Sequence, residues 1–216
     1  MSQAFTLPEP PSLPIAGGSA RFPVRRIYCV GRNYADHAKE MGGNPDREPP
    51  FFFMKPADAI VSGNGAIPYP PRTKNLHHEV ELVVALGPGA GIFGHAVGID
   101  LTRRDLQDEA KKAGRPWEMG KSFDRSAPCG PITPATRALT EGRISLKING
   151  EQRQNGDLED LIWPVDAVLK HLADYVELQA GDLIYTGTPS GVGPIAPGDQ
   201  LLAEIEGLPR LEITVG

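Results

Sequence analysis

The feature that most constrains the fold is an apolar run interrupted by carboxylates. Residues 75–87 read NLHHEVELVVALG and are the longest strand candidate in the chain. Side chains alternate in direction along a strand, so the even-numbered residues from 80 to 86 would face a core, while Glu79 and Glu81 would share the other face. Two such carboxylates ~4 Å apart repel each other by about 4 kcal/mol at an effective dielectric near 20. Unless that face is fully solvated, a positive group must lie between them.

A third carboxylate joins this pair if the next segment is the hairpin partner. Residues 95–101, HAVGIDL, follow a glycine-rich turn and place Asp100 in an apolar context near Glu79 and Glu81. Three carboxylates with no accompanying Cys or ligand-like His favour a hard ion, Mg²⁺ or Mn²⁺, over Zn²⁺. The alternative from spacing alone is a solvated strand face, with Asp100 as a helix-start residue.

The rest of the chain indicates a β-rich α+β domain with a few peripheral helices. Its 22 prolines and 25 glycines predict many turns. Residues 1–24 are expected to be an irregular N-terminal arm because their prolines exclude a helix and no strand pattern runs through them, and residues 25–216 a single catalytic domain. Thr102 is expected to cap a helix over 103–113, and Pro164 to open another. Asn149-Gly150 predicts a type I′ hairpin turn. Further strands are expected at 26–31, 50–56, 143–156, 182–188, 199–205 and 211–215, and a short helix at 34–41.

One motif is misleading. Residues 89–94, GAGIFG, match GxGxxG after a strand, but the dinucleotide-binding reading needs a helix to begin there. The following residues look like strand, so we expect a loose turn.

Charge and composition exclude several classes of protein. The net charge of -5, with no basic cluster, argues against a nucleic-acid partner. Cys29 and Cys129 are too few for a disulfide framework. The N-terminus lacks the features of a signal peptide, and no apolar run reaches the roughly 18–20 residues that cross a bilayer. We therefore expect a cytoplasmic protein with no membrane association.

Six motifs along the chain form a recognisable set. In chain order they are YCVGRNYADHAKEM, FFFMKP, NLHHEVELVVALG, GIDLTRRDLQDEAKKAGRPWEMGKSFD, LKINGEQRQNG and IYTGTPSGVGP. Taken together, these motifs resemble the fumarylacetoacetate hydrolase superfamily, and within it the short acylpyruvases and fumarylpyruvate hydrolases. The resemblance covers roughly residues 25–216 and implies a mixed β-sandwich roll, usually a homodimer.

The resemblance also implies roles for individual residues. Glu79, Glu81 and Asp100 match the metal ligands of the family, for one Mg²⁺ or Mn²⁺ ion per subunit. Lys121 matches the lysine that stabilises the developing oxyanion. His37 and Glu40 match the catalytic pair, in which Glu40 orients His37 to take a proton from water. Taken alone, such a pair is more commonly a surface helix pair, and Lys121 would be an exposed lysine.

Weaker expectations concern the substrate. Gln107 and Thr188 match family positions that contact substrate or water, and Arg32, Tyr34 and Arg115 could meet the distal end of an acidic substrate or be purely structural. His77 and His78 are expected outside the metal ligands, as supporting groups. Glycines at 31, 42 and 43 suggest that the segment carrying His37 closes over the substrate.

The implied activity is hydrolysis of the C–C bond of a 2,4-diketo acid, with fumarylpyruvate, from gentisate catabolism, as the best single substrate. Oxaloacetate decarboxylation or tautomerisation, and isomerisation of a ring-cleavage dienoate, start from the same metal-held enolate and stay open. A non-catalytic metal-binding domain is the alternative from another class.

Overall fold

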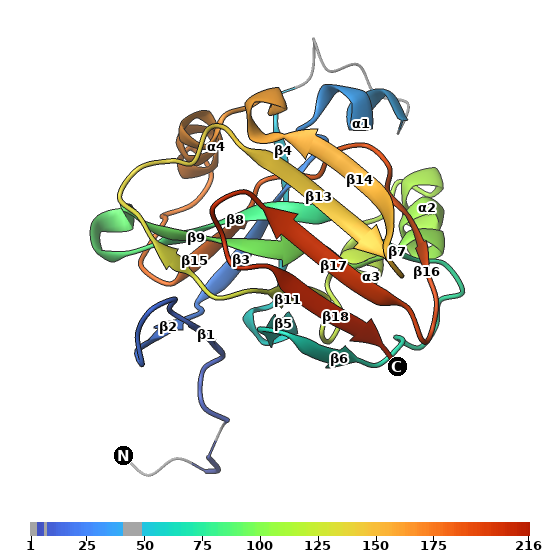
Figure 1. The fold of residues 1–216 in the computed structure, drawn as a ribbon, viewed down its shortest axis with the longest axis horizontal. Coiled ribbons are helices and arrows are strands. Elements are labelled where there is room, and N and C mark those ends of the chain that lie inside the picture. Colours follow the sequence, from blue (N-terminus) through green and yellow to red (C-terminus); the bar gives the residue numbers. More distant parts are fainter. Residues whose placement is uncertain (1–3, 7, 41–48) are drawn as a thin grey trace.

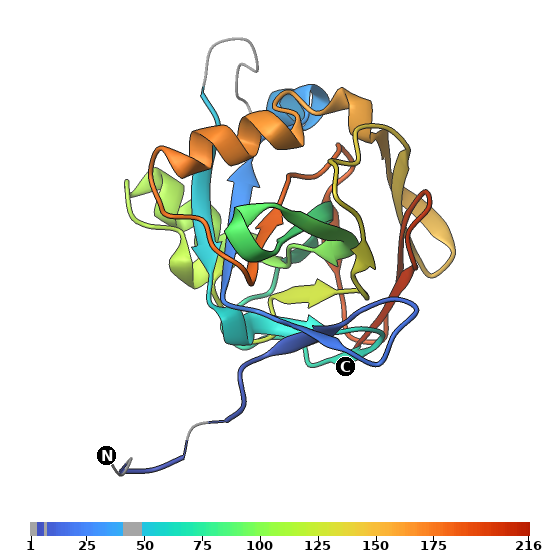
Figure 2. The same cartoon turned by 90° about the vertical axis from the view of Figure 1, so that its left-hand side faces the viewer.

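The computed structural model describes residues 4–6, 8–40 and 49–216. Two large β-sheets pack against each other, and the helices lie around their edges (Figures 1 and 2). The sheets combine parallel and antiparallel pairs, which confirms the expected β-rich roll.

The larger sheet is eight-stranded and is built around the antiparallel pair β8 and β9. Val80 lies opposite Ile99 and Leu82 opposite Val97, so the expected hairpin between these segments is confirmed. The order of the strands is β4 (Phe51–Lys55), β3 (Arg26–Gly31), β15 (Asp182–Tyr185), β8 (Val80–Leu86), β9 (Ile92–Ile99), β11 (Ala127–Cys129) and β5 (Ile60–Ser62), with β12 (Thr133–Pro134) also paired to β9.

The second sheet is five-stranded and crosses in front of the first in Figure 1. Its hairpin turns at Asn149 and Gly150, whose φ angles of 51° and 83° are those of the predicted type I′ turn. The order of its strands is β14 (Glu151–Asp157), β13 (Arg143–Ile148), β17 (Gln200–Ile205), β18 (Leu211–Val215) and β6 (Gly65–Ile67).

Two small sheets complete the strands. One joins β10 (Thr102–Arg103), β7 (Leu76–His78) and β16 (Gly193–Ile195) beside the end of β8. The other pairs β1 (Ser12–Pro14) with β2 (Arg21–Pro23), so the expectation that no strand runs through residues 1–24 is wrong. Leu13 and Phe22 are buried there, and this packing gives the segment its regular structure.

Strand β8 is buried on both faces, which the alternation of its sequence did not predict. The even-numbered residues from Val80 to Leu86 belong to a cluster shared with the five-stranded sheet. Val83 and Ala85, on the same face as Glu81, pack in a second cluster with Leu13 and Phe22. Glu79 and Glu81 therefore cannot be solvated as an exposed strand face would be.

The helices are short and peripheral. They are α1 (Ala35–Glu40), α2 (Arg104–Lys112), α3 (Glu118–Lys121) and α4 (Val165–Ala173), with 3-10 turns at Pro88–Ala90 (η2), Ala57–Ala59 (η1) and Leu158–Asp160 (η3). Helix α4 begins after Pro164, as predicted. Thr102 does not cap α2: it lies in β10, and its hydroxyl accepts a hydrogen bond from Lys121. At the GxGxxG match, the short 3-10 turn η2 leads into β9, so the motif opens no α-helix.

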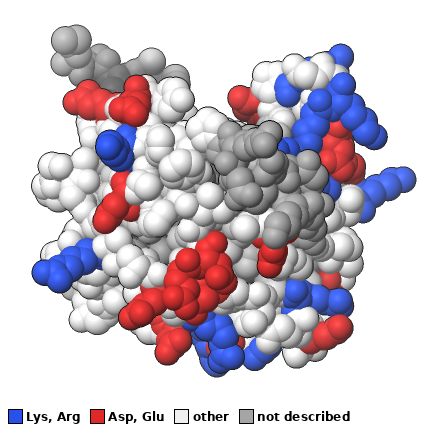
Figure 3. All heavy atoms as spheres, turned by 90° about the horizontal axis from the view of Figure 1, so that it is seen from above, with Lys and Arg blue, Asp and Glu red and all other residues white. Residues whose placement is uncertain are grey.

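Three further properties follow from the described residues. None of their helices is long and apolar enough to span a membrane. Cys29 and Cys129 are buried and unpaired, and burial raises both thiol pKa values, that of Cys129 to about 12. On the face seen in Figure 3, basic and acidic side chains are interspersed, with one gathering of acidic groups.

Candidate active site

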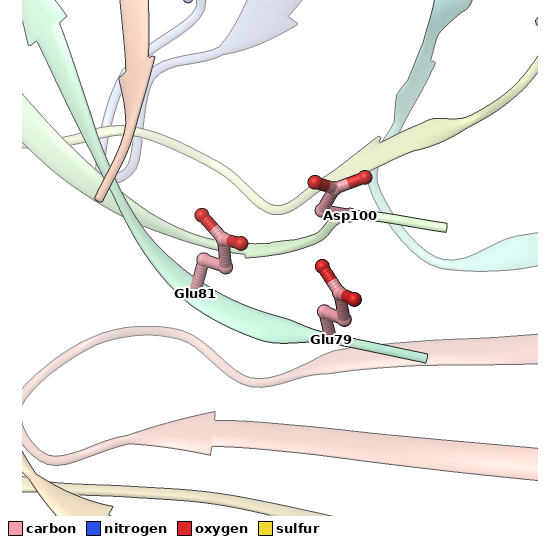
Figure 4. A group of neighbouring side chains, drawn as sticks. All are labelled: Glu79, Glu81 and Asp100. Carbon is pink, nitrogen blue, oxygen red and sulfur yellow. The ribbon is translucent and has the colours of Figure 1, made fainter. Parts of the chain in front are cut away.

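Three carboxylates meet where β8 and β9 pair. Glu79 separates β7 from β8, Glu81 is the second residue of β8, and Asp100 directly follows β9. The Asp100 amide donates to the Glu79 carbonyl oxygen at 2.8 Å, which continues the register of the pair by one residue. One oxygen from each carboxylate lies within 4.8 Å of the others, and all three side chains are buried (Figure 4). The sequence prediction that these residues come together is confirmed.

Buried cations surround the carboxylates, as the repulsion argument required. Lys121 Nζ, at the end of α3, lies 2.7 Å from Glu79 Oε2, 2.8 Å from Asp100 Oδ2 and 2.7 Å from Thr102 Oγ1. Arg104 Nη2 pairs with Glu79 Oε1, and Lys55 Nζ lies 2.8 Å from Asp100 Oδ1. All three N–H donors of Lys121 are thus occupied, so the oxyanion role predicted for it requires one of these bonds to be released.

Lys55 and Arg104 are site residues that the sequence reasoning missed. Lys55 ends an apolar strand, FFFMK, yet its side chain is fully buried and also donates to the Leu101 carbonyl oxygen at 3.1 Å. The available signal was only a lysine at the end of an apolar strand, and the sequence did not place that strand beside the carboxylates. Arg104 carried none, because the first residue of a surface helix is commonly charged.

Glu81 differs from its two neighbours because no side-chain cation touches it among the described residues. Its Oε2 accepts a hydrogen bond from the Gly187 amide, at 2.8 Å. Burial, with repulsion from Asp100 and Glu79, raises the pKa of Glu81 well above its ordinary value. The opposite holds for Glu79: although burial opposes the shift, Lys121 and Arg104 lower its pKa.

The donor set fits a hard divalent cation. It consists of carboxylate oxygens, and Asp100 Oδ1, although close to Lys55 Nζ, is buried without a hydrogen bond of proper geometry from the described residues. An added divalent charge would relieve the repulsion that raises the pKa of Glu81. Carboxylate oxygens suit Mg²⁺ or Mn²⁺. Glu79, Glu81 and Asp100 can therefore hold such an ion.

A cavity opens onto Glu79 and Glu81. Of the residues that the sequence pointed to, it is lined by His37, Arg32, Gln107, Lys121 and Thr188. An aromatic wall that the sequence did not predict adds Phe51, Phe53 and Trp117, with the Phe51 and Trp117 rings 5.0 Å apart, edge to face. The cavity therefore combines a polar end at the carboxylates with an apolar side.

The predicted catalytic pair is only half described. The His37 side chain, from α1, is buried and lines the cavity. Its position is close enough to Glu79 for a charge on the imidazole to lower the pKa of that carboxyl group. Glu40 is the last residue of α1, but its side chain lies outside the described residues, as do glycines 42 and 43 of the expected closing segment.

Three other predicted residues have different positions relative to the cavity. Gln107 accepts a hydrogen bond at Oε1 from Arg104 at 2.6 Å, which leaves its amide N–H groups available to a ligand in the cavity. Tyr34 is buried but does not line the cavity, and its hydroxyl has no hydrogen-bond partner among the described residues. Arg115 lines an adjoining hollow beside Trp117.

The two histidines lie outside the carboxylate group, as expected. His77 Nδ1 accepts from Arg104 Nε at 3.3 Å, so it supports the arginine that holds Glu79. Burial, reinforced by the positive charge of Arg104, lowers the pKa of His77 to about 4. His78 Nδ1 lies 2.9 Å from Gln154 Oε1, and neither histidine belongs to the group of candidate ligand atoms.

Comparison with known proteins places these features in a family. Residues 26–216 match the family model "Fumarylacetoacetate (FAA) hydrolase C-terminal". A fumarylpyruvate hydrolase of Ralstonia sp is 42% identical over 180 residues, covering 78% of this chain and 94% of that protein. An oxaloacetate tautomerase of Escherichia coli is 39% identical over 204 residues, covering 88% and 93%.

A solved structure agrees with the sequence relatives. The crystal structure of fumarylpyruvate hydrolase from Pseudomonas aeruginosa, in complex with Mn²⁺ and pyruvate, superposes with a TM-score of 0.96 at 48% identity, covering 99% of each chain. The chain studied here belongs to the fumarylacetoacetate hydrolase C-terminal family.

Proposed function

We propose that the protein is a divalent-metal-dependent hydrolase of 2,4-diketo acids, with fumarylpyruvate as its best substrate. The observation that carries the proposal is that His37 lines one cavity with Glu79 and Glu81, two of the three grouped carboxylates. A cation site and a proton acceptor that face the same space suit the hydrolysis of a keto acid by water. The identities of 42% and 48% to fumarylpyruvate hydrolases support the choice of substrate.

Glu79, Glu81 and Asp100 would hold the ion. When bound, it supplies Lewis acidity and a template for the carboxylate and keto oxygen of the 2-keto acid end. Lys121, which bridges Glu79 and Asp100, would turn one N–H group toward the oxyanion that develops on the substrate. Gln107 and Thr188 line the same wall as further donors.

His37 is the proposed general base, with Glu40 as the group that orients its ring. His37 takes a proton from water, and the hydroxide so formed adds to the distal carbonyl carbon of the substrate. The bond between this carbon and the adjacent methylene carbon then breaks, and its electron pair passes to the pyruvate fragment as an enolate. The proton returns to that fragment, so the products of fumarylpyruvate are fumarate and pyruvate. Phe51, Phe53 and Trp117 would cover the distal part of the substrate.

Oxaloacetate tautomerisation is the second candidate function, because relatives at 39% identity carry that name. The two reactions share the keto acid end and differ in their need for an attacking water. Exchange of His37 for alanine should lower hydrolysis about 10²- to 10⁴-fold, the usual contribution of a general base. An equal loss of both activities would contradict the division of roles.

The direct test follows the absorbance of the diketo acid for fumarylpyruvate, acetylpyruvate and fumarylacetoacetate, and detects pyruvate and fumarate as products. Oxaloacetate tautomerisation and decarboxylation are measured on the same preparation. We expect fumarylpyruvate to be cleaved fastest, a chelator to abolish turnover, and Mn²⁺ or Mg²⁺ to restore it. Metal-loaded protein that binds pyruvate but turns over none of these substrates would instead support a non-catalytic binding domain.

The proposal also includes a homodimer in the cytoplasm. Light scattering after size-exclusion chromatography tests the oligomeric state, and a single monomeric species would contradict it.

A further inference from the structure

One predicted motif has no role in the mechanism above: the hairpin of β13 and β14. Along β14 the side chains of Glu151, Gln152 and Arg153 are exposed, but that of Gln154 is completely buried. A buried primary amide must be hydrogen-bonded to be tolerated, so its partners indicate its purpose. They lie on the strand that carries the metal-ligand carboxylates and on the loop that carries Thr188.

The orientation of the Gln154 amide follows from partners whose roles are unambiguous. The backbone N–H of Val80 can only donate, and it lies 3.1 Å from Oε1. The backbone carbonyl of Pro189 can only accept, and it lies 2.9 Å from Nε2. Both constraints give the same orientation, so Nε2 also donates to Thr188 Oγ1 at 2.7 Å.

This orientation determines what Thr188 can offer a ligand. Its oxygen accepts the hydrogen bond from Gln154, so its single proton is not used there. Thr188 is buried and lines the cavity together with Glu81. Its hydroxyl is thus presented as a donor to the cavity, where an anionic oxygen would accept it.

We propose that Gln154 is a positioning residue that sets the direction of the Thr188 hydroxyl, so that the cavity receives a carboxylate or enolate oxygen of a 2-keto acid at this point. The proposal rests on the proposed function for the class of ligand. The same amide joins β14 to residues 78–80, which flank Glu79, so one side chain fixes the distance between the carboxylates and Thr188.

The other end of the network provides a spectroscopic reporter. Because Gln154 Oε1 is an acceptor, His78 Nδ1, 2.9 Å away, must carry the proton. His78 Nε2 is then an unprotonated nitrogen, and it is buried without a hydrogen bond from the described residues. Nitrogen-15 NMR of histidine-labelled protein distinguishes the two tautomers. We expect the Nδ1–H form at His78, assigned by comparison with His78→Gln; the Nε2–H form would overturn the proposal.

The decisive variant is Gln154→Glu, which keeps the size of the side chain. An ionised carboxylate still accepts from Val80 and His78 but cannot donate, so Thr188 would turn its proton away from the cavity. Losing a hydrogen bond to a charged ligand group predicts a fall in the affinity of the Mn²⁺-loaded protein for pyruvate, and in kcat/KM, of about 10- to 100-fold. Gln200→Glu, the same change at an exposed side chain on β17 of the same sheet, is the matched control and should change both by less than about threefold.

A double-mutant cycle separates positioning from general support of the fold. Thr188→Val removes the hydroxyl and should by itself reproduce the loss. If Gln154 acts through Thr188, adding Gln154→Glu to Thr188→Val costs less than about threefold more. A full additional loss in the double variant would overturn the proposal. The wild-type turnover assay tests the hydrolase function separately, since the tautomer and pyruvate binding do not depend on which reaction follows.

Discussion

Two buried acidic sites in this molecule differ in how completely cations match their negative charges. Asp182, at the start of β15, is fully buried, and its oxygens accept hydrogen bonds from Arg25, Arg26 and the Gln179 amide. Its charge is matched where it lies, and the arginines reach solvent with exposures of 38% and 26%. This arrangement joins β15 to β3, and the Asp182 carboxylate needs no bound cation to balance its charge.

The group of Glu79, Glu81 and Asp100 has cations as well, but their distribution is uneven. Lys121, Arg104 and Lys55 all act on Glu79 or Asp100, while Glu81 receives only a backbone amide among the described residues. The comparison shows that burial of carboxylates alone does not define a metal site. What distinguishes the group of Glu79, Glu81 and Asp100 is an unmatched carboxylate, Glu81, that lines a cavity beside a matched one, Glu79.

The largest expected effect is on the unmatched residue. Glu81→Gln should lower kcat/KM about 10³-fold or more, since it removes a ligand from an ion that contributes several kcal/mol to catalysis. It should not destabilise the metal-free protein, because it removes a repelled charge. Steady-state turnover and thermal unfolding without metal measure the two effects. A variant that lost activity only by unfolding would count against the assignment.

The matched residue should behave in the reverse way. Asp182→Ala leaves two arginines without their partner, so we expect a loss of about 2–3 kcal/mol in the free energy of unfolding, moderated by their access to solvent. Denaturant titration measures it. Mn²⁺ affinity and turnover of the folded fraction should stay at the wild-type values; a tenfold change in either would show that the two sites are not independent.

The pH dependence of stability sharpens the same contrast. The pKa of Glu81 is raised above its ordinary value of 4.5, so the folded protein takes up a proton that the unfolded chain lacks. Stability of the metal-free form should therefore fall as pH rises above that value, by up to about 1.4 kcal/mol per pH unit within the window. A bound ion removes the free-energy cost of ionising Glu81 in the folded protein, so stabilisation by Mn²⁺ should increase with pH. Melting temperatures with and without Mn²⁺ test this, with Glu81→Gln expected to flatten the metal-free curve.

The smallest effect concerns His77, which accepts a hydrogen bond from Arg104. Because the pKa of His77 is lowered to about 4, the unfolded chain binds a proton between pH 6.5 and 4 that the folded protein excludes. Stability should fall as pH falls through this window, by about 1–2 kcal/mol once partial exposure is allowed for. In denaturant titrations, His77→Gln should reduce this slope. Identical slopes in wild type and His77→Gln would refute the assignment.

The parts of the fold that sequence predicted are those set by local rules. Alternation predicted β8 and β9, and the Asn149-Gly150 turn fixed the hairpin of the second sheet. What local rules missed depends on distant packing. The β1–β2 pair exists because Leu13 and Phe22 pack against one face of the large sheet. Thr102 does not cap α2 because it lies in β10, where its hydroxyl accepts a hydrogen bond from Lys121.

The candidate site divides in the same manner. Period-two spacing brought Glu79 and Glu81 to one face, and strand pairing brought Asp100 to them. Lys55 and Gln154 could not be assigned roles from spacing, because each reaches its partners from a strand that is remote in sequence. Tyr34, predicted to meet the substrate, lies off the cavity wall because its ring packs in the core near Leu161.

The most direct test of the central claim is anomalous diffraction from crystals of this protein soaked in Mn²⁺. The account predicts one strong manganese peak, about 2 Å from oxygens of Glu79, Glu81 and Asp100, and its loss in Glu81→Gln. A peak elsewhere, or none at a Mn²⁺ concentration that supports turnover, would contradict it.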